Sequence, residues 1–554
     1  MTGPVDQERG QFHDLLEKAI SGQLDRRQVM TRAAVLGLSA ASVFTLGAAA
    51  APGTTSLSNV ARQDATPVAG GILRVGLQGD PALLDPHTTQ LTAAIHVTEH
   101  IYEGLVVENP DLTIGPWLAA ELPTVSEDGL TYTFTLRDNV MFHTPVSRLM
   151  TSADVVYSFG RMVDPALGGN SLSVLEPIVS IEAPDDMTVV FTLSAPNAAF
   201  LAALASRYLA IVPQEFVEQN GGDLNQAACG TGPFVFEEYV PTTRLTVTKN
   251  AEYWDTGKPY LDGIEFTPIS DDTQRTNAII TDTVDFVEYA PLADIERLRG
   301  ESELMIAGDI NTNIRFIGIN LRREPFSDVR VRRAMAMALN RAEILEPATF
   351  GNGTATEVIF PEGNWAHVTV PETPQDIEGA KALLAEAGFP DGFELEILSW
   401  SAYSFLSQPS YVIQSQLEAI GITSEVVLEE NATYIDRYIL SGEFDFDITV
   451  TGTSGFVDPN DVYADNFLST STSNAAGYNN PMVDQLIADG IATTDQAARA
   501  EIYTQLQTIL LEDLPWINLF IANQYEAMKL TVGGYTHYPT GSLVSLRNTF
   551  ITPE

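Results

Sequence analysis

The spacing of apolar residues changes near Asn311, and this change constrains the fold more than any other feature of the sequence. Between residues 71 and about 303, short runs alternate apolar and polar residues, and turn residues separate the runs. Such a period of two predicts half-buried β-strands. Examples of these runs are Tyr132–Leu136, Val189–Leu193 and Leu245–Val247.

Beyond Asn311 the pattern predicts strands that alternate with amphipathic helices. Ser327 or Asp328 can cap one helix, and a second is expected from Asp376 to Ala387, where Gly388 can end it in the left-handed conformation. A third helix contains the apolar positions Ile502, Leu506, Ile509 and Leu510 and is closed by Pro515. Because no low-complexity linker separates the two halves, we expect two lobes whose segments cross more than once, with a cleft between them.

The N-terminus has the order of features that is typical of an export signal. An Arg26-Arg27 pair is followed by an uncharged stretch, Ala33–Ala51, that ends in small residues. This order predicts a twin-arginine signal over residues 1–51, cleaved near Ala49–Ala51, and the stretch is a poor permanent membrane span. Residues 52–70 are rich in Thr, Ser, Ala and Pro and are expected to form a flexible linker.

The charge balance excludes one large class of partners. The chain has 29 Lys and Arg residues against 73 Asp and Glu residues, which gives a formal net charge of −44. A surface of this kind repels polyanions, so nucleic acid is not an expected partner. The single cysteine, Cys229, excludes disulfides within the chain and sites that need several thiolates.

One motif allows an enzyme interpretation. His96, Glu99 and His100 match the H-x-x-E-H pattern, in which two histidines on one helical face hold zinc beside a catalytic glutamate. An apolar stripe over the same residues also fits an ordinary packed helix. Nucleophile-elbow, P-loop and dinucleotide-binding motifs are absent from the sequence. We therefore predict no catalysis and no cofactor, and we keep an extracytoplasmic zinc hydrolase as the alternative.

Two predicted strands of the second half deliver candidate ligand-binding residues. The first, at residues 394–399, is followed by aromatic side chains, and the second, at residues 444–450, by a polar loop. In α/β sheets, ligands bind in the crevice outside the carboxyl ends of the strands. The cleft candidates are therefore Trp400, Tyr403, Thr453, Ser454, Phe456 and Asp458.

Several stretches in order along the chain resemble one family, the extracytoplasmic solute-binding proteins of ABC importers, in the group of oligopeptide-, dipeptide- and nickel-binding proteins. The resemblance covers nearly all of residues 71–540. It is carried by Gly70–Val75 with Leu84–His87, Tyr102–Leu105, Tyr132–Arg137 with Val140–His143, Thr151–Ser158, Gly230–Phe234, Asn250–Trp254, Pro325–Ala334 and Ala380–Gly388.

The resemblance implies an α/β, two-lobed fold of the periplasmic-binding-protein type II, in its large peptide-binding subclass. The first lobe would span residues 71–305 with an inserted β-rich subdomain at about 101–180, the second lobe 306–519, and residues 520–554 would return to the first lobe. It further implies a monomer that works outside the cytoplasm. This monomer would enclose a small ligand between its closing lobes and deliver it to the transmembrane subunits of an ABC permease.

The resemblance also implies particular ligand contacts. Asp80 occupies the first-lobe position from which peptide-binding members direct an acidic side chain to the ligand. Those members carry a second aspartate, for the peptide's α-amino group, where this chain has Gly455 or a neighbour, so Asp80 or Asp458 would have to replace it. A peptide is the expected ligand, and uncharged oligosaccharides on Trp400 and Tyr403, opine-like or other amines, and metal chelates stay as alternatives.

Overall fold

The computed structural model describes residues 66–554 except 90, 165–166, 168–174, 176, 402, 441, 443, 454–456 and 554. The predicted signal, residues 1–51, and the predicted linker up to residue 65 lie outside the described residues. Within the described part, no helix has the length and apolar character needed to cross a membrane.

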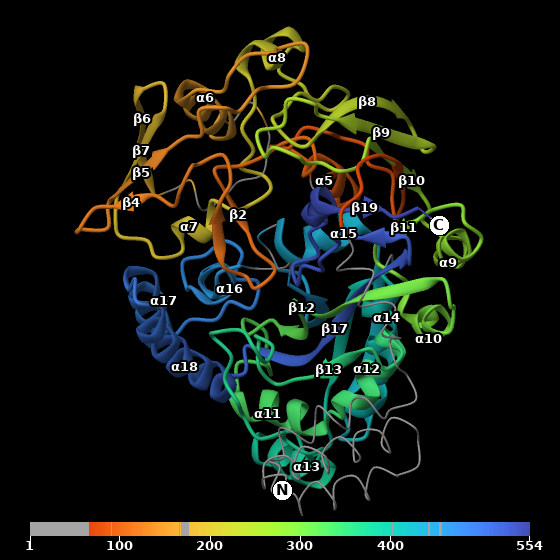
Figure 1. The fold of residues 1–554 in the computed structure, drawn as a ribbon. Coiled ribbons are helices and arrows are strands. Elements are labelled where there is room, and N and C mark those ends of the chain that lie inside the picture. Colours follow the sequence, from red (N-terminus) through yellow and green to blue (C-terminus); the bar gives the residue numbers. More distant parts are fainter. Residues whose placement is uncertain are drawn as a thin grey trace, which may run out of the picture. The chain divides into compact units, whose positions relative to one another are not determined.

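One mixed sheet of 11 strands runs through the described residues, in the order β15-β14-β16-β12-β17-β11-β1-β10-β9-β8, with β13 paired to β17. Its two longest strands, β12 (Leu304–Ile319) and β17 (Trp516–Lys529), lie antiparallel at its centre (Figure 1). The other strands are β1 (Ile72–Leu77), β8 (Phe234–Val240), β9 (Arg244–Lys249), β10 (Gly263–Pro268), β11 (Phe286–Val287), β13 (Gly353–Ala355), β14 (Glu394–Trp400), β15 (Thr423–Glu429) and β16 (Ile448–Gly452).

The two ends of the β12–β17 pair belong to different lobes. The start of β12 pairs with the end of β17, which also pairs with β11 of the first lobe, whereas the end of β12 pairs with β16 of the second lobe. Between Ile310 and Ile314 the pairing of β12 with β17 shifts register. A bulge of this kind bends and twists a strand pair locally, so it marks where the crossover connection changes direction between the lobes.

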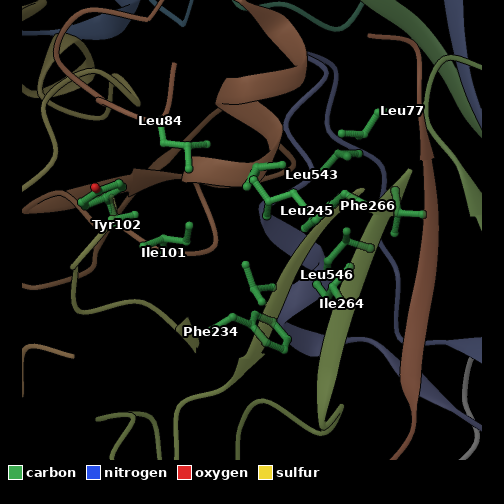
Figure 2. Close-up of a cluster of buried hydrophobic side chains, with 14 of the residues drawn as sticks. Leu77, Leu84, Ile101, Tyr102, Phe234, Leu245, Ile264, Phe266, Leu543 and Leu546 are labelled. Atoms are coloured by element: carbon green, nitrogen blue, oxygen red, sulfur yellow. The ribbon is translucent and has the colours of Figure 1, made fainter. Parts of the chain in front are cut away.

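The first lobe has its main core under β1 and β10. Alternate residues of β1, namely Leu73, Val75 and Leu77, are fully buried, as the period-two pattern predicts. They belong to one cluster with side chains from β8 to β10 and with Leu543 and Leu546 of the C-terminal segment, and Figure 2 shows Leu77 among these side chains. The helices of this lobe are α5 (Thr92–Thr98), α6 (Ser152–Met162), α7 (Phe200–Ala203), α8 (Gln214–Gln219), α9 (Asp272–Ile280) and α10 (Ile295–Arg299).

A second core of the first lobe lies under a separate antiparallel sheet in the order β4-β5-β7-β6. Its strands are β4 (Thr124–Val125), β5 (Thr131–Thr135), β6 (Ile178–Asp185) and β7 (Thr188–Leu193). Phe134 and Phe191 from neighbouring strands meet edge to face, 5.7 Å apart. The sheet reaches Leu193, past the expected end of the inserted subdomain at about residue 180. The small pairs β2 (Val106–Glu108) with β3 (Ile114–Pro116) and β18 (Val532–Gly533) with β19 (Phe550–Ile551) complete the strands.

The second lobe confirms the three predicted helices. They are α11, which Asp328 caps, α13, which Asp376 caps before the left-handed Gly388, and α18, which ends at the left-handed Leu514 before Pro515. Helices of this lobe are α11 (Val329–Ala338), α12 (Arg341–Thr349), α13 (Ile377–Glu386), α14 (Ser404–Glu418), α15 (Asn431–Ile435), α16 (Pro459–Phe467), α17 (Pro481–Ala492) and α18 (Gln496–Asp513).

One predicted strand is shorter than expected. The strand at 444–450 begins only at Ile448, as β16. Phe444 has a φ of 50°, which is incompatible with a strand, and the side-chain amide of Asn320 donates to the carbonyls of Phe444 and Phe446. These carbonyls therefore bind a side chain instead of joining the sheet.

Gly230 offers a test of first-lobe packing. A Cβ at this position would lie 2.1 Å from the carbonyl oxygen of Ile101, which is backbone and cannot move alone. We expect Gly230→Ala to lower the free energy of unfolding by about 1–3 kcal/mol, measured by urea denaturation. The matched control is Gly160→Ala in α6, where a Cβ would meet nothing within 4 Å; it should be neutral or stabilise the protein. Equal stability of the two variants would contradict the packing described here.

Candidate functional site

The two lobes touch directly in this structure. The Ala198 N–H, just before α7, donates to the Ile491 carbonyl in α17 over 2.7 Å. The Asn352 side chain donates to the Leu292 carbonyl over 3.3 Å. Near the first contact, α16 of the second lobe lies beside α7 and β2 of the first (Figure 1).

A cavity of about 290 Å³ lies where these elements meet. Most of its lining comes from the first lobe, between Thr98 and Glu108, between Ala202 and Ala210, and between Tyr538 and Val544. Val457 and Asp461 complete it from the second lobe. Because both lobes line the cavity, a ligand there contacts both at once, and its volume is near the lower end of ligand pockets.

The charges around this cavity are strongly unbalanced. Among the described residues, Glu99, Glu103, Glu108 and Asp461 line it, and Arg207 is the single cation. Arg207 Nη1 lies 3.8 Å from Glu99. Glu103 accepts hydrogen bonds from Thr231, Tyr253 and Trp254, and Glu99 accepts from the Ser542 hydroxyl and the Leu543 N–H. These two carboxylates therefore already have donors within the first lobe.

Glu108 and Asp461 are less well compensated: within the described ranges, only Arg207 and Thr540 act against the pKa shift of Glu108, and only Arg499 acts against that of Asp461. Burial raises the pKa of Glu108 to about 7, and Glu108 Oε1 has no hydrogen-bond partner among the residues that the structure describes. Burial and the neighbouring Asp458 raise the pKa of Asp461 to about 8. A desolvated carboxylate of this kind is stabilised by a cation that enters the cavity, so the site is suited to a positively charged ligand group.

Asp458, by contrast, is committed to the second lobe. It caps α16 by accepting from the Asn460 N–H, and both its oxygens accept from Arg499 of α18 over 2.7 and 2.8 Å. The pair is almost fully buried. Its oxygens are thus occupied by the helix and by the guanidinium, which favours a structural role over ligand binding.

The aromatic candidates form one connected group at the carboxyl ends of β14 and β16. Trp400 is the last residue of β14, not the residue after it as expected, and it stacks on Tyr434 at 4.0 Å. Tyr403, which precedes α14, meets Trp400 edge-on at 5.3 Å, and Phe405 follows at 5.4 Å from Tyr403. Tyr403 is 41% exposed and Phe405 37%. The indole N–H of Trp400 is buried and finds no acceptor in the described part of the chain.

The remaining predicted site residues have different surroundings. Thr453 follows β16 and is held to β12 by two hydrogen bonds. Its N–H donates to the Ile314 carbonyl, and its hydroxyl accepts from the Ile314 N–H. Ser454 and Phe456 lie outside the described residues. Asp80 is held by the Tyr239 hydroxyl at 2.8 Å and the Thr242 N–H at 3.1 Å, while its Oδ1 is buried and has no partner among the described residues. It does not line the interlobe cavity.

The H-x-x-E-H residues do not converge on one point. His96 pairs with Glu288, Glu99 binds Ser542 and Leu543, and His100 lies beyond the end of α5, stacked on Phe266. Burial lowers the pKa of His100 to about 3. Over the described ranges, no group of three or more His, Cys, Asp or Glu residues could hold a metal ion. The geometry therefore does not support the zinc hydrolase alternative.

Two larger cavities, of about 550 and 690 Å³, lie in the second lobe and beside the crossover strands. The first is lined by residues of α11, α18 and the segment 357–376, and the second mainly by residues 354–372. Neither is lined by a described residue before Asp309, so a ligand in them would not bridge the lobes.

Four residues of this region were not predicted from the sequence: Glu108, Asp461, Phe405 and Arg315. Arg315 is a charge inside the otherwise apolar run Ile314–Ile319, which was the available signal, since charged residues in central strands are rarely buried without purpose. Asp461 follows Asp458 by three residues and so lies one turn further along α16. Nothing in the sequence distinguished Glu108 from other surface carboxylates.

The two-lobed fold with long strands crossing between the lobes defines a periplasmic binding protein. Residues 113–475 match the profile of bacterial extracellular solute-binding proteins, family 5 Middle, and the chain belongs to this family. Its members are non-enzymatic, extracytoplasmic components of transport systems, so this chain is a substrate-binding protein of an ABC importer.

Three similar proteins illustrate the range of the family. Heme-binding protein A of Haemophilus influenzae is 30% identical over 478 residues, which cover 80% of this chain and 86% of that protein. The structure of AgaA from A. tumefaciens, in complex with agropinic acid, is 32% identical with a TM-score of 0.75 and covers 87% of this chain and 99% of that one. DppA from Helicobacter pylori, in complex with the peptide STSA, is 25% identical with a TM-score of 0.77 and covers 88% and 99%.

The different roles of Asp458 and Asp461 can be tested by stability. Removing one partner of a buried ion pair leaves an uncompensated charge, so Asp458→Ala should lower the free energy of unfolding by about 3–5 kcal/mol. Asp461→Asn is the matched control on the same helix. Its folded-state pKa of about 8 lies above the ordinary unfolded value, so at pH 7 folding requires Asp461 to take up a proton, which costs free energy. The neutral amide avoids this cost and should leave stability unchanged or higher. Urea denaturation at pH 7 measures both variants, and a loss in Asp461→Asn as large as in Asp458→Ala would contradict these roles.

Proposed function

We propose that this protein captures a small organic solute with a protonated amino group, most simply a short peptide, between its two lobes and delivers it to the permease of an ABC importer. Residues 1–51 would export it as a twin-arginine signal, residues 52–70 would act as the linker, and the mature protein would work as a monomer outside the cytoplasm. Residues 71–305 with 520–554 form the proposed first lobe and residues 306–519 the second.

One observation supports the amino-group proposal above the others: Glu108 and Asp461 come from opposite lobes and line the same cavity, and Arg207 is the only cation among the described residues of its lining. Without a ligand, closing the lobes brings two desolvated carboxylates toward one another, which costs free energy. An ammonium group between them removes that cost. The ligand therefore favours the closed state because it touches both lobes, which is the thermodynamic requirement for closure.

This arrangement also offers a solution to the missing aspartate at Gly455. A buried ammonium without a carboxylate costs several kcal/mol, so a peptide binder needs an acidic group for the α-amino end. Asp458 is occupied by Arg499, and Asp80 by Tyr239 and Thr242, although Asp80 keeps one free oxygen. Asp461 has no such partner among the described residues and lines the cavity. We therefore assign the proposed amino contact to Asp461 and Glu108.

The aromatic group would hold the rest of the ligand. Trp400 and Tyr403 remain the proposed platform, with the free indole N–H as a donor to a ligand oxygen, and Thr453 and the loop residues Ser454 and Phe456 would border it. The peptide in the DppA structure and the agropinic acid in the AgaA structure both carry oxygen acceptors that such a donor can bind. Peptides and opine-like amines are thus the first ligand classes to test.

The proposal predicts that a free amino group is required for binding. Ala-Phe and N-acetyl-Ala-Phe should differ at least tenfold in affinity by isothermal titration calorimetry, because the acetylated peptide cannot neutralise Glu108 and Asp461. Asp461→Asn should weaken Ala-Phe binding by tenfold or more. Glu501→Gln, which removes an exposed carboxylate of α18, is the charge-matched control and should bind like the wild type. Equal binding of both peptides would refute the amino-group contact. If only sugars or metal chelates bound, they would replace peptides as the proposed ligand class.

The raised pKa values predict a pH dependence of binding. Glu108 and Asp461 are ionised only above about pH 7 and 8 in the ligand-free protein, and an ammonium ligand binds the ionised forms. Affinity for Ala-Phe should therefore fall as the pH is lowered from 7.5 to 5.5, and binding near pH 7 should release protons. Calorimetry in two buffers of different ionisation enthalpy measures this release, which should shrink in Asp461→Asn. Proton uptake on binding would contradict the assignment.

A further inference from the structure

Arg315 has an unusual position in β12, directly opposite Gly452 at the end of β16. A Cβ on Gly452 would lie 2.4 Å from Arg315 Nη1 and 2.8 Å from its Cδ. The arginine side chain thus occupies the space that the side chain of any other residue at position 452 would fill. Its guanidinium carbon lies 5.2 Å from the centre of the Phe405 ring, which joins Arg315 to the aromatic group of Tyr403 and Trp400.

Arg315 is also an arginine without a counter-charge. No carboxylate oxygen lies within 4.0 Å of it in the described part of the chain, and the sequence has no acidic residue at positions 454–456. Burial lowers its pKa to about 10, and Tyr289 alone opposes that shift. An anion stabilises a desolvated guanidinium by more free energy than it stabilises an exposed one, because it replaces the hydration that the desolvated group has lost.

Arg315 is half-buried, and four of the five almost fully buried arginines among the described residues have different surroundings. Arg161 pairs with Asp85, Arg499 with Asp458, and Arg341 with Glu357, while Arg332 donates to the carbonyls of Phe326 and Asp513. Each of them meets an anion or a carbonyl oxygen that satisfies its N–H groups. A structural explanation of that kind is therefore missing for Arg315.

We propose that Arg315 is a specificity-determining residue that binds a carboxylate of the ligand, with the apolar part of the ligand on Trp400, Tyr403 and Phe405. This inference rests on the proposed function and deepens it, because it makes the ligand a zwitterion. A planar guanidinium in a fixed position binds a carboxylate through two parallel N–H donors, which an amide or a hydroxyl cannot match.

The amino and carboxylate contacts border one common segment. Tyr289, which interacts with Arg315, has its hydroxyl 3.0 Å from the position of a Cβ on Gly541. The neighbours of Gly541, Thr540 and Ser542, line the cavity that contains Glu108 and Asp461. A ligand with an amino group at one end and a carboxylate at the other could therefore reach both along this segment.

The test compares Ala-Phe with its C-terminal amide, Ala-Phe-NH₂, on the mature protein by calorimetry. The wild type should bind the acid at least tenfold more tightly than the amide. In Arg315→Gln this preference should fall below threefold, mainly through weaker binding of the acid, and Arg315→Lys should be intermediate because it keeps charge without the planar donor pair. The control Arg297→Gln removes one exposed positive charge of α10 and should keep the full preference. An unchanged preference in Arg315→Gln overturns the proposal.

A second measurement separates this inference from the proposed function. If neither peptide binds the wild type, peptide capture fails, and sodium benzoate is compared with benzamide by tryptophan fluorescence: a benzoate response lost in Arg315→Gln supports the anion anchor, and the same response in both proteins overturns it. The melting temperature of ligand-free Arg315→Gln should equal or exceed that of the wild type, since an uncompensated cation is removed. A drop of more than about 5 °C would show a structural cation and also overturn the proposal.

Discussion

The antiparallel pairing of β12 and β17 is the constraint on which the rest of the molecule depends. Each strand contributes one end to each lobe, and the register of their pairing shifts twice, between Ile310 and Ile314 and between Arg315 and Phe316. The lobes are therefore tied by backbone hydrogen bonds and can still differ in orientation at the bulge. The site follows from this arrangement, because Arg315 lies on β12 just past the bulge, and Gln524 of β17 borders Gly541 beside the cavity segment.

In this proposal, electrostatic interactions with the ligand favour the closed arrangement of the two lobes. The chain has few cationic residues, and most of the buried ones form structural ion pairs, such as Arg161 with Asp85 and Arg499 with Asp458. Glu108 and Asp461, whose pKa values are raised by burial, line the interlobe cavity, and Arg315, whose pKa is lowered by burial, lies over the Phe405 ring. A protein commonly accepts such costs at a functional site, and here a zwitterionic ligand would remove them.

Local patterns predicted the fold well where a pattern reflects a local cause. The alternation in β5, β7 and β9 and the capped helices α11 and α13 were predicted because burial and capping act over a few residues. The start of β16 was wrong, since a distant side chain, Asn320, takes the carbonyls that would have extended it. Trp400 and Tyr403 were placed at the proper strand end. Asp461 and Arg315 were missed because their significance depends on which partners are absent in three dimensions, and spacing along the chain does not report that.

Capture of a zwitterion between the lobes is tested most directly by a crystal structure of the mature protein with a bound ligand. The ligand is the one that most raises the melting temperature in a screen of peptides, opine-like amines, sugars and metal chelates. We expect ligand density between the lobes, with an amino group near Asp461 and Glu108 and a carboxylate on Arg315. Ligand density confined to the second-lobe cavity lined by Met337 and Trp516, with Arg315 and Asp461 untouched, would contradict it.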